Sequence, residues 1–136
     1  MKIGSRLQGG ETIELIGDLG AGKTAFVRGL TAGMGSDDDV SSPSFTLGNQ
    51  YKAGKLTLHH FDFYRIQEPG IMRQEMAEVL QDQNAAVVAE WADPVRSILP
   101  GDRLTIRITP DGNTGRKFEF SYPGSLSYLV PDGKED

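Results

Sequence analysis

The run Gly17–Thr24 constrains this chain more than any of its other features. Its sequence, GDLGAGKT, fits the P-loop pattern G-x-x-x-x-G-K-[ST] at every fixed position. The run Thr12–Ile16 before it is typical of a strand, and Ala25–Leu30 after it is typical of the start of a helix. A glycine-rich loop in this context turns backbone N–H groups toward an anion at the positive end of the helix. The pattern therefore predicts a nucleoside triphosphate site.

The chemistry of phosphate binding gives the loop residues separate roles. The Lys23 ammonium is expected to reach the β- and γ-phosphates, and the Thr24 hydroxyl is expected to bind Mg²⁺. The expected phosphate-binding residues are the whole loop: Gly17, Asp18, Leu19, Gly20, Ala21, Gly22, Lys23 and Thr24.

Length and composition limit the class of protein. At 136 residues, the chain is expected to form a single domain over residues 1–136. The absence of cysteine excludes a disulfide scaffold, thiolate metal sites and a cysteine nucleophile. Neither a signal peptide nor an 18-residue apolar run is present, which predicts a cytoplasmic protein that does not enter a membrane. With 19 acidic and 14 basic residues, the net charge is −5, so contact with nucleic acid is expected only through a partner.

Strand-like and helix-like segments alternate along the chain. Besides Thr12–Ile16, the expected strands are Leu56–Phe63, Ala85–Ala89 and a hairpin of Leu104–Ile108 with Lys117–Phe120. The expected helices are the one after the P-loop, ending near Gly33 and Gly35, then Pro69–Gln83 and a turn at Asp93–Leu99. The pattern predicts an α/β, P-loop NTPase-like fold with a mostly parallel central sheet, flanking helices and a C-terminal β-hairpin. Residues 123–136 are expected to form a flexible tail.

Two carboxylates follow apolar strands. Asp62 ends the second expected strand, and Glu90 follows Val87–Ala89. The carboxyl ends of parallel strands meet at the edge where α/β proteins bind their ligands. Because Mg²⁺ in phosphoryl-transfer sites is held by carboxylates as well as by the P-loop hydroxyl, we expect Thr24, Asp62 and Glu90 to be metal ligands.

Several other residues leave two interpretations open. The hydroxyl-rich segment Ser41–Thr46 is either an ordinary Ser/Pro loop or a switch that orders around the γ-phosphate. His59 and His60 have no second ligand at metal spacing, so packing or exposure is favoured over ligation. Trp91 is either a packing residue or a ring beside the nucleotide, and Arg116 is a candidate anion contact.

Four motifs together resemble the TsaE family, also called YjeE, of small bacterial P-loop ATPases. They are the P-loop, Ser42–Leu47 (SPSFTL), His60–Arg65 (HFDFYR) and Glu90-Trp91, in that order, and the resemblance covers roughly residues 10 to 120. It implies an ATP- and Mg²⁺-dependent ATPase needed for threonylcarbamoyladenosine formation at position 37 of ANN-decoding tRNAs. It also implies two partners, TsaD and TsaB, whose complex is reset by ATP hydrolysis between turnovers and through which the chain meets tRNA only indirectly.

The resemblance also implies roles for individual residues. Thr46, in the switch-like loop, would respond to the γ-phosphate, Arg116 would approach the nucleotide, and Trp91 would lie beside the site. Asp62 would support both the metal and hydrolysis. The implied catalytic set is Lys23, Thr46, Asp62 and Glu90.

The chain departs from the family pattern in three places. Ser44 stands where threonine is common, and Ala25 replaces a second hydroxyl after the P-loop threonine. Residues 1–10 are expected to form a shortened N-terminal region, long enough for a short helix where the family usually has a further strand and helix.

Two other functions compete with the ATPase interpretation. A small P-loop kinase acting on a nucleoside or other small molecule would need an arginine-rich lid, and the chain has no such segment. A GTP-dependent switch would need the guanine-reading motif N-K-x-D, which is absent.

Overall fold

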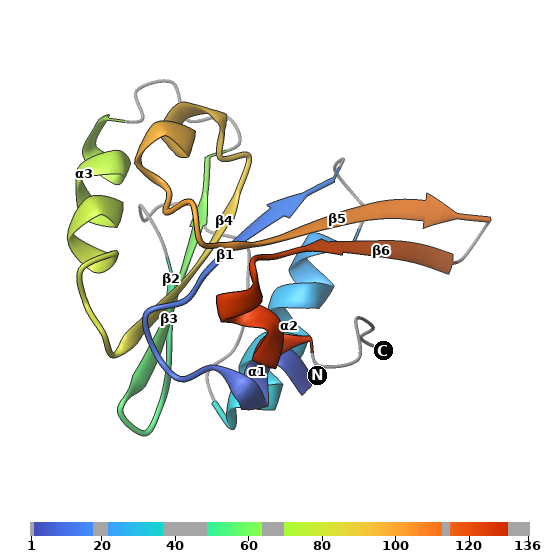
Figure 1. Ribbon diagram of the computed structural model, residues 1–136, viewed down its shortest axis with the longest axis horizontal. Coiled ribbons are helices and arrows are strands. Elements are labelled where there is room, and N and C mark those ends of the chain that lie inside the picture. The colour runs from blue at the N-terminus through green and yellow to red at the C-terminus, as the bar shows by residue number, and fades with distance from the viewer. Residues whose placement is uncertain (1, 18–21, 37–48, 64–69, 113–114, 131–136) are drawn as a thin grey trace.

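The computed structural model describes residues 2–17, 22–36, 49–63, 70–112 and 115–130. The strands are β1 Thr12–Ile16, β2 Asn49–Ala53, β3 Leu56–Asp62, β4 Ala85–Glu90, β5 Leu104–Asp111 and β6 Gly115–Ser121 (Figure 1). The helices are α1 Lys2–Arg6, α2 Lys23–Met34 and α3 Gly70–Val79, with the 3₁₀ helices η1 Asp93–Ile98 and η2 Gly124–Leu129. No helix in these ranges is both long enough and apolar enough to cross a bilayer.

The strands form one sheet in the order β2-β3-β4-β1-β5-β6. The four central strands, β3, β4, β1 and β5, pair in parallel. The two edge strands are antiparallel to their neighbours, β2 to β3 and β6 to β5. This arrangement confirms the predicted α/β fold with a mostly parallel centre and a C-terminal hairpin. The edge strand β2 was not predicted, because only Tyr51 of its five residues is buried and the strand lacks a clear apolar alternation.

Helices lie on both faces of the sheet (Figure 1), and a hydrophobic core fills the space on each face. On one face, α1, α2 and η2 pack on the strands, with buried residues that include Ile3, Ile13, Leu30, Val88, Ile106 and Leu129. On the other face, α3 and η1 cover β3 and β4, with buried residues that include Phe61, Met72, Met76, Val87 and Val95. Every residue of β4 is buried, as expected for a central parallel strand covered on both sides.

Helix α2 follows the apolar stripe that its sequence predicts. Phe26 and Leu30 are buried against the sheet, and Met34 packs against the same core. The helix ends at Gly35, whose left-handed backbone (φ 85°) lets its N–H bond the carbonyls of Ala32 and Thr31. A residue with a side chain would adopt this conformation only with strain, so the glycine sets the C-terminus of α2.

The sequence pattern predicts a flexible tail over residues 123–136, and for residues 124–130 this prediction is wrong. They form η2, in which Leu129 and the following Val130 are completely buried. The Arg6 guanidinium of α1 donates to the Leu129 carbonyl at 3.0 Å, and the Tyr128 hydroxyl donates to Glu11 Oε2 at 2.5 Å. Apolar residues spaced three and four apart are buried along one side of this short helix. In the sequence, the polar residues between them hide this spacing. The rest of the expected tail, residues 131–136, lies outside the described residues.

Helix α1 lies against α2 through a glycine. A methyl carbon on Gly4 would lie 2.2 Å from the Leu30 carbonyl oxygen, so no larger residue fits between the two helices as they are placed. The short N-terminal helix expected in residues 1–10 is therefore docked on the P-loop helix.

We predict that Gly4→Ala destabilises the protein by about 1–3 kcal/mol, because the added methyl group forces α1 away from α2. Alanine favours a helix over glycine, so without this close contact the change would stabilise the protein. Urea unfolding measures the difference. Gly70→Ala, at the start of α3 with nothing within 4 Å of the added carbon, is the matched control. Equal stability of the two variants would contradict the docking of α1.

Candidate functional site

The parallel register brings three chain segments to one edge of the sheet. Asp62 pairs with Glu90, and Glu90 in turn is level with Leu15 of β1. Gly17 follows the end of β1 immediately, and α2 begins at Lys23. The predicted strand-end carboxylates therefore end neighbouring strands beside the start of the P-loop, as the sequence pattern predicted.

Lys23 is the centre of this edge. It is only 6 % exposed, although lysine is one of the residues least often buried. Its Nζ donates to the Gly17 carbonyl at 2.5 Å, lies 4.0 Å from Glu90 Oε1 and lies 4.1 Å from the centroid of the Trp91 ring. A carbonyl, a carboxylate and an aromatic face thus surround one ammonium group, which compensates for its removal from water.

The start of α2 has the backbone that an anion site requires. Gly22, at the N-cap, has a left-handed backbone with φ 100°, and no side chain among the described residues caps the helix there. The first N–H groups of α2 therefore receive no side-chain cap from the described residues, and they lie at the positive end of the helix dipole. Arg116 lies close by, since a methyl carbon on Gly22 would be 3.8 Å from its Nε. Strand β6 thus brings the predicted anion contact beside the P-loop.

His60 is the site residue that sequence reasoning missed. It is 1 % exposed, and its Nε2 hydrogen-bonds Oε2 of Glu90, which is 4 % exposed. The signal was present in the strand, because His60 lies two residues before Asp62 and therefore on the same face of β3. Without the β3–β4 register, however, nothing indicated that this face met Glu90.

Trp91, the first residue after β4, has an unusual backbone conformation. Its φ of 55° is the only left-handed value of a non-glycine residue among those described. This conformation costs on the order of 1–3 kcal/mol and persists only where surrounding contacts hold it. Here it places the indole ring over the Lys23 ammonium. Trp91 also packs against the hydrophobic core that contains Phe61 and Met72, as one of its two interpretations predicts. Its position beside a bound nucleotide stays a prediction.

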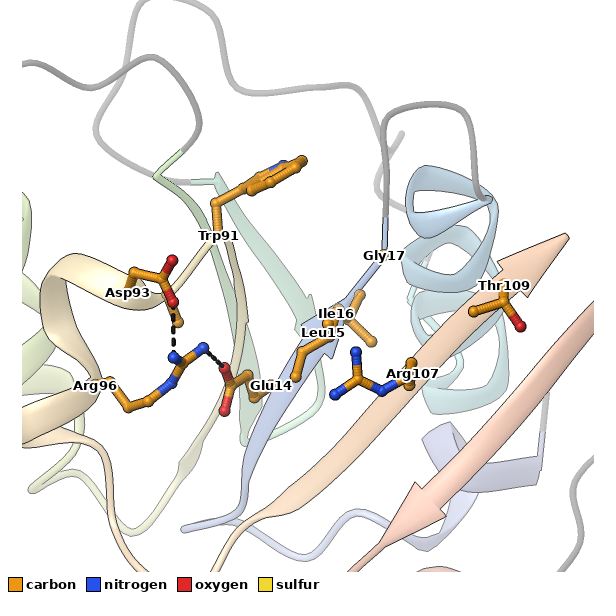
Figure 2. A pocket seen from close by; sticks show the side chains of 10 residues that line it. Glu14, Leu15, Ile16, Gly17, Trp91, Asp93, Arg96, Arg107 and Thr109 are labelled. Carbon is orange, nitrogen blue, oxygen red and sulfur yellow. Dashed lines mark hydrogen bonds and ion pairs between the residues drawn. The ribbon is translucent and has the colours of Figure 1, made fainter.

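A pocket of about 270 Å³ lies on the other face of the sheet, away from α2 (Figure 2). Its wall contains an ion-pair network in which the buried Glu14 accepts from Arg96 at 2.6 Å and from Arg103 at 3.0 Å. The hydrogen bond to Glu14 raises the pKa of the Arg96 guanidinium above its ordinary value, although burial lowers it. Trp91 and Gly17, the first residue of the P-loop, also line this pocket.

The described residues contain no cluster of three or more His, Cys, Asp or Glu side chains that could hold a metal ion alone. Mg²⁺ in phosphoryl-transfer sites does not need such a cluster, because it takes one or two carboxylates together with phosphate oxygens and water. Thr24 at the start of α2 and the in-register pair Asp62 and Glu90 supply that kind of ligand set. These residues fit Mg²⁺ brought by a nucleotide.

Some predicted site residues lie outside the described part of the chain. They are Asp18, Leu19, Gly20 and Ala21 of the P-loop, together with Thr46 and the whole Ser42–Leu47 motif. Their roles stay predictions.

Comparison with known proteins gives consistent matches over most of the chain. The family model described as "Threonylcarbamoyl adenosine biosynthesis protein TsaE" matches residues 1–118. Among curated relatives, the tRNA threonylcarbamoyladenosine biosynthesis protein TsaE of Bacillus subtilis is 37% identical over 116 residues, which is 85% of this chain and 72% of that protein. The protein of the same name from Treponema pallidum is 39% identical over 113 residues, covering 82% of this chain and 83% of the relative.

A solved structure matches the fold as well. The crystal structure of Bacillus subtilis YdiB superimposes with a TM-score of 0.71 and 30% sequence identity, covering 96% of this chain and 80% of that one. Family model, relatives and fold therefore agree, and the matched region includes every described residue of the site. This chain belongs to the TsaE family.

Proposed function

We propose that the chain binds and hydrolyses ATP within the machinery that forms threonylcarbamoyladenosine in tRNA. Family membership supports the pathway. The observation that supports the chemistry is the buried Lys23 ammonium, which lies at the start of α2 between the Gly17 carbonyl and the Glu90 carboxylate. The ammonium group of a lysine in this place can exchange its present partners for the oxygens of a phosphate.

In this proposal the chain holds the triphosphate mainly with its backbone. The N–H groups at the start of α2 bind phosphate oxygens, and Lys23 exchanges the Gly17 carbonyl for the β- and γ-phosphates. Arg116, beside Gly22, adds a second positive charge from β6. These donors stabilise the negative charge that develops on the phosphate oxygens during hydrolysis.

Mg²⁺, when bound with the nucleotide, would neutralise phosphate charge and orient the γ-phosphate for attack by water. Thr24 and Glu90 would hold it, with Asp62 next to Glu90 supporting the metal and the hydrolytic step. Glu90 already lies 4.0 Å from the ammonium that would bind the same phosphates. Thr46 is expected to respond to the γ-phosphate.

We further propose that hydrolysis drives a partner complex, made of TsaD-like and TsaB-like proteins, between turnovers. The chain would meet tRNA through that complex, which agrees with its net charge of −5. Because its partners act on tRNA, the proposal places the chain in the cytoplasm.

Lys23→Ala and Thr24→Ala should each lower Mg²⁺-dependent ATP hydrolysis by at least about a hundredfold, because each removes a phosphate or metal contact that nothing nearby replaces. Phosphate release in the presence of the partners measures the loss. Lys55→Ala, which removes an exposed lysine from the turn between β2 and β3, is the control for charge alone. Wild-type turnover in Lys23→Ala would overturn the assignment of the P-loop.

The partners should accelerate ATP hydrolysis by more than about tenfold over the isolated chain. Arg116 is exposed in this structure, and a partner that covers it would exclude water and strengthen its attraction for the phosphates. Turnover is compared with and without the partners, using wild type and Arg116→Ala. We expect Arg116→Ala to lose most of the acceleration. Equal, fast rates of the wild-type chain alone and in the complex would contradict this prediction.

Emission from Trp91, the only tryptophan, should change saturably when Mg²⁺ and ATP are added. The reason is that phosphates draw the Lys23 ammonium away from the indole ring, which it now approaches to 4.1 Å. Lys23→Ala is the control, and its emission should not respond. Unchanged wild-type emission, while calorimetry shows that ATP is bound, would mean that Lys23 keeps its contact with Trp91.

A further inference from the structure

The His60 imidazole is buried, and its contact with Glu90 gives a hydrogen-bond partner to only one of its two ring nitrogens. Nε2 bonds the Glu90 carboxylate, whereas Nδ1 is buried without a hydrogen-bond partner among the described residues. On this face of β3 and β4 the neighbouring residues are the apolar Leu58, Ala86 and Val88, together with Asp62 and Glu90 at the strand ends, and Asn49 of β2 lies opposite His60. An apolar side chain would fill this space at less cost, so packing alone does not account for a histidine here.

The contact sets the position of the proton on the ring. A carboxylate only accepts hydrogen bonds, so Nε2 must carry the hydrogen that Glu90 Oε2 receives. Nδ1 has no acceptor within the described ranges, and a proton there would leave a buried N–H unpaired. The tautomer with hydrogen on Nε2 and a bare Nδ1 is therefore the one that costs least.

This hydrogen bond determines which way the Glu90 carboxylate is turned. The terminal torsion of glutamate is broad, and the carboxylate of an unheld glutamate rotates readily. With Oε2 bonded to His60, Oε1 is the oxygen that lies 4.0 Å from Lys23 Nζ, on the side of the P-loop. One oxygen is thus anchored in the core, and the other is directed toward the place where the nucleotide would bind.

We propose that His60 is the positioning residue for Glu90, which it holds with one oxygen turned to the Mg²⁺ that accompanies ATP. This inference rests on the proposed function, because it assumes that Glu90 takes part in Mg²⁺ binding. Partners of this kind orient metal ligands, and their loss usually lowers metal affinity by about 10- to 100-fold.

The neighbouring histidine supplies a matched control. His59 lies on the opposite face of β3, where its ring stacks near Phe61 with 6.4 Å between centroids. A change at His59 tests the loss of a histidine from the same strand without touching Glu90.

The experiment measures the Mg²⁺ concentration needed for half-maximal ATP binding, by calorimetry, in His60→Leu, His60→Gln and His59→Leu. His60→Leu fills the space but donates nothing, and we expect it to raise the Mg²⁺ midpoint at least about tenfold. The amide of His60→Gln can donate from nearly the position of Nε2, so its midpoint should stay within about threefold of wild type. His59→Leu should leave the midpoint unchanged. ATP binding in EDTA should change less than twofold in all three variants.

A double-mutant cycle separates positioning from a general effect on the fold. If His60 acts through Glu90, His60→Leu should not shift the Mg²⁺ midpoint further in a Glu90→Gln background. Thermal unfolding of each variant gives its stability independently of metal binding. A folded His60→Leu protein with the wild-type midpoint, or His60→Gln as impaired as His60→Leu, would overturn the proposal.

The tautomer gives a test that needs no variant at position 60. Long-range ¹H–¹⁵N spectra of the wild-type chain, with His59→Gln used to assign the two rings, should show His60 protonated on Nε2 and bare on Nδ1. A proton on Nδ1 alone would overturn the inference, whatever the stability of the variants. Failure of the wild-type chain to bind ATP at any Mg²⁺ concentration would instead overturn the proposed function and this inference with it.

Discussion

The parallel pairing of β3, β4 and β1 is the constraint on which the site depends. Parallel strands end at the same edge of the sheet, and the register sets Asp62 beside Glu90 and Glu90 beside Leu15, two residues before Gly17. A shift of one residue in β4 would turn Glu90 to the opposite face of the sheet, away from Lys23. The complete burial of β4 opposes such a shift, because both of its faces are packed in hydrophobic cores.

A positive and a negative charge are buried together at this edge. Removing either ion from water costs several kcal/mol, and the cost is recovered only through close partners. Lys23 and Glu90 each have more than one partner, since the lysine also bonds the Gly17 carbonyl and the glutamate bonds His60. A phosphate that entered the site would offer Lys23 a stronger partner than a carbonyl and would leave Glu90 available to a cation. The arrangement therefore suits a ligand that brings an anion and a metal together.

The other face of the sheet helps to place Trp91. Glu14 of β1 is buried and pairs with Arg96 of η1 (Figure 2) and with Arg103, and the pair with Arg96 ties the segment that follows β4 to the central strand. The Arg96 side chain is 48 % exposed, so water screens its pair with Glu14, but the contact still links η1, and with it the connection between β4 and η1, to β1. Trp91 lies in that connection with its left-handed backbone. The ion pair between Glu14 and Arg96, on the face of the sheet away from α2, thus helps to hold the strained backbone of Trp91.

The sequence by itself determined the P-loop, the strands β1, β3 and β4, the hairpin and the carboxylates at the strand ends, because each follows from local pattern and spacing. It did not determine β2, whose single buried residue Tyr51 gives no alternation, or η2, whose buried Leu126 and Leu129 are separated by Ser127 and Tyr128. Nor could it show that His60 bonds Glu90 or that Arg116 lies beside Gly22, since these pairs are 30 and about 90 residues apart in the chain. Only the tertiary structure decided these contacts, because strand register and the packing of α2 on the sheet bring distant residues together, and no local periodicity records that.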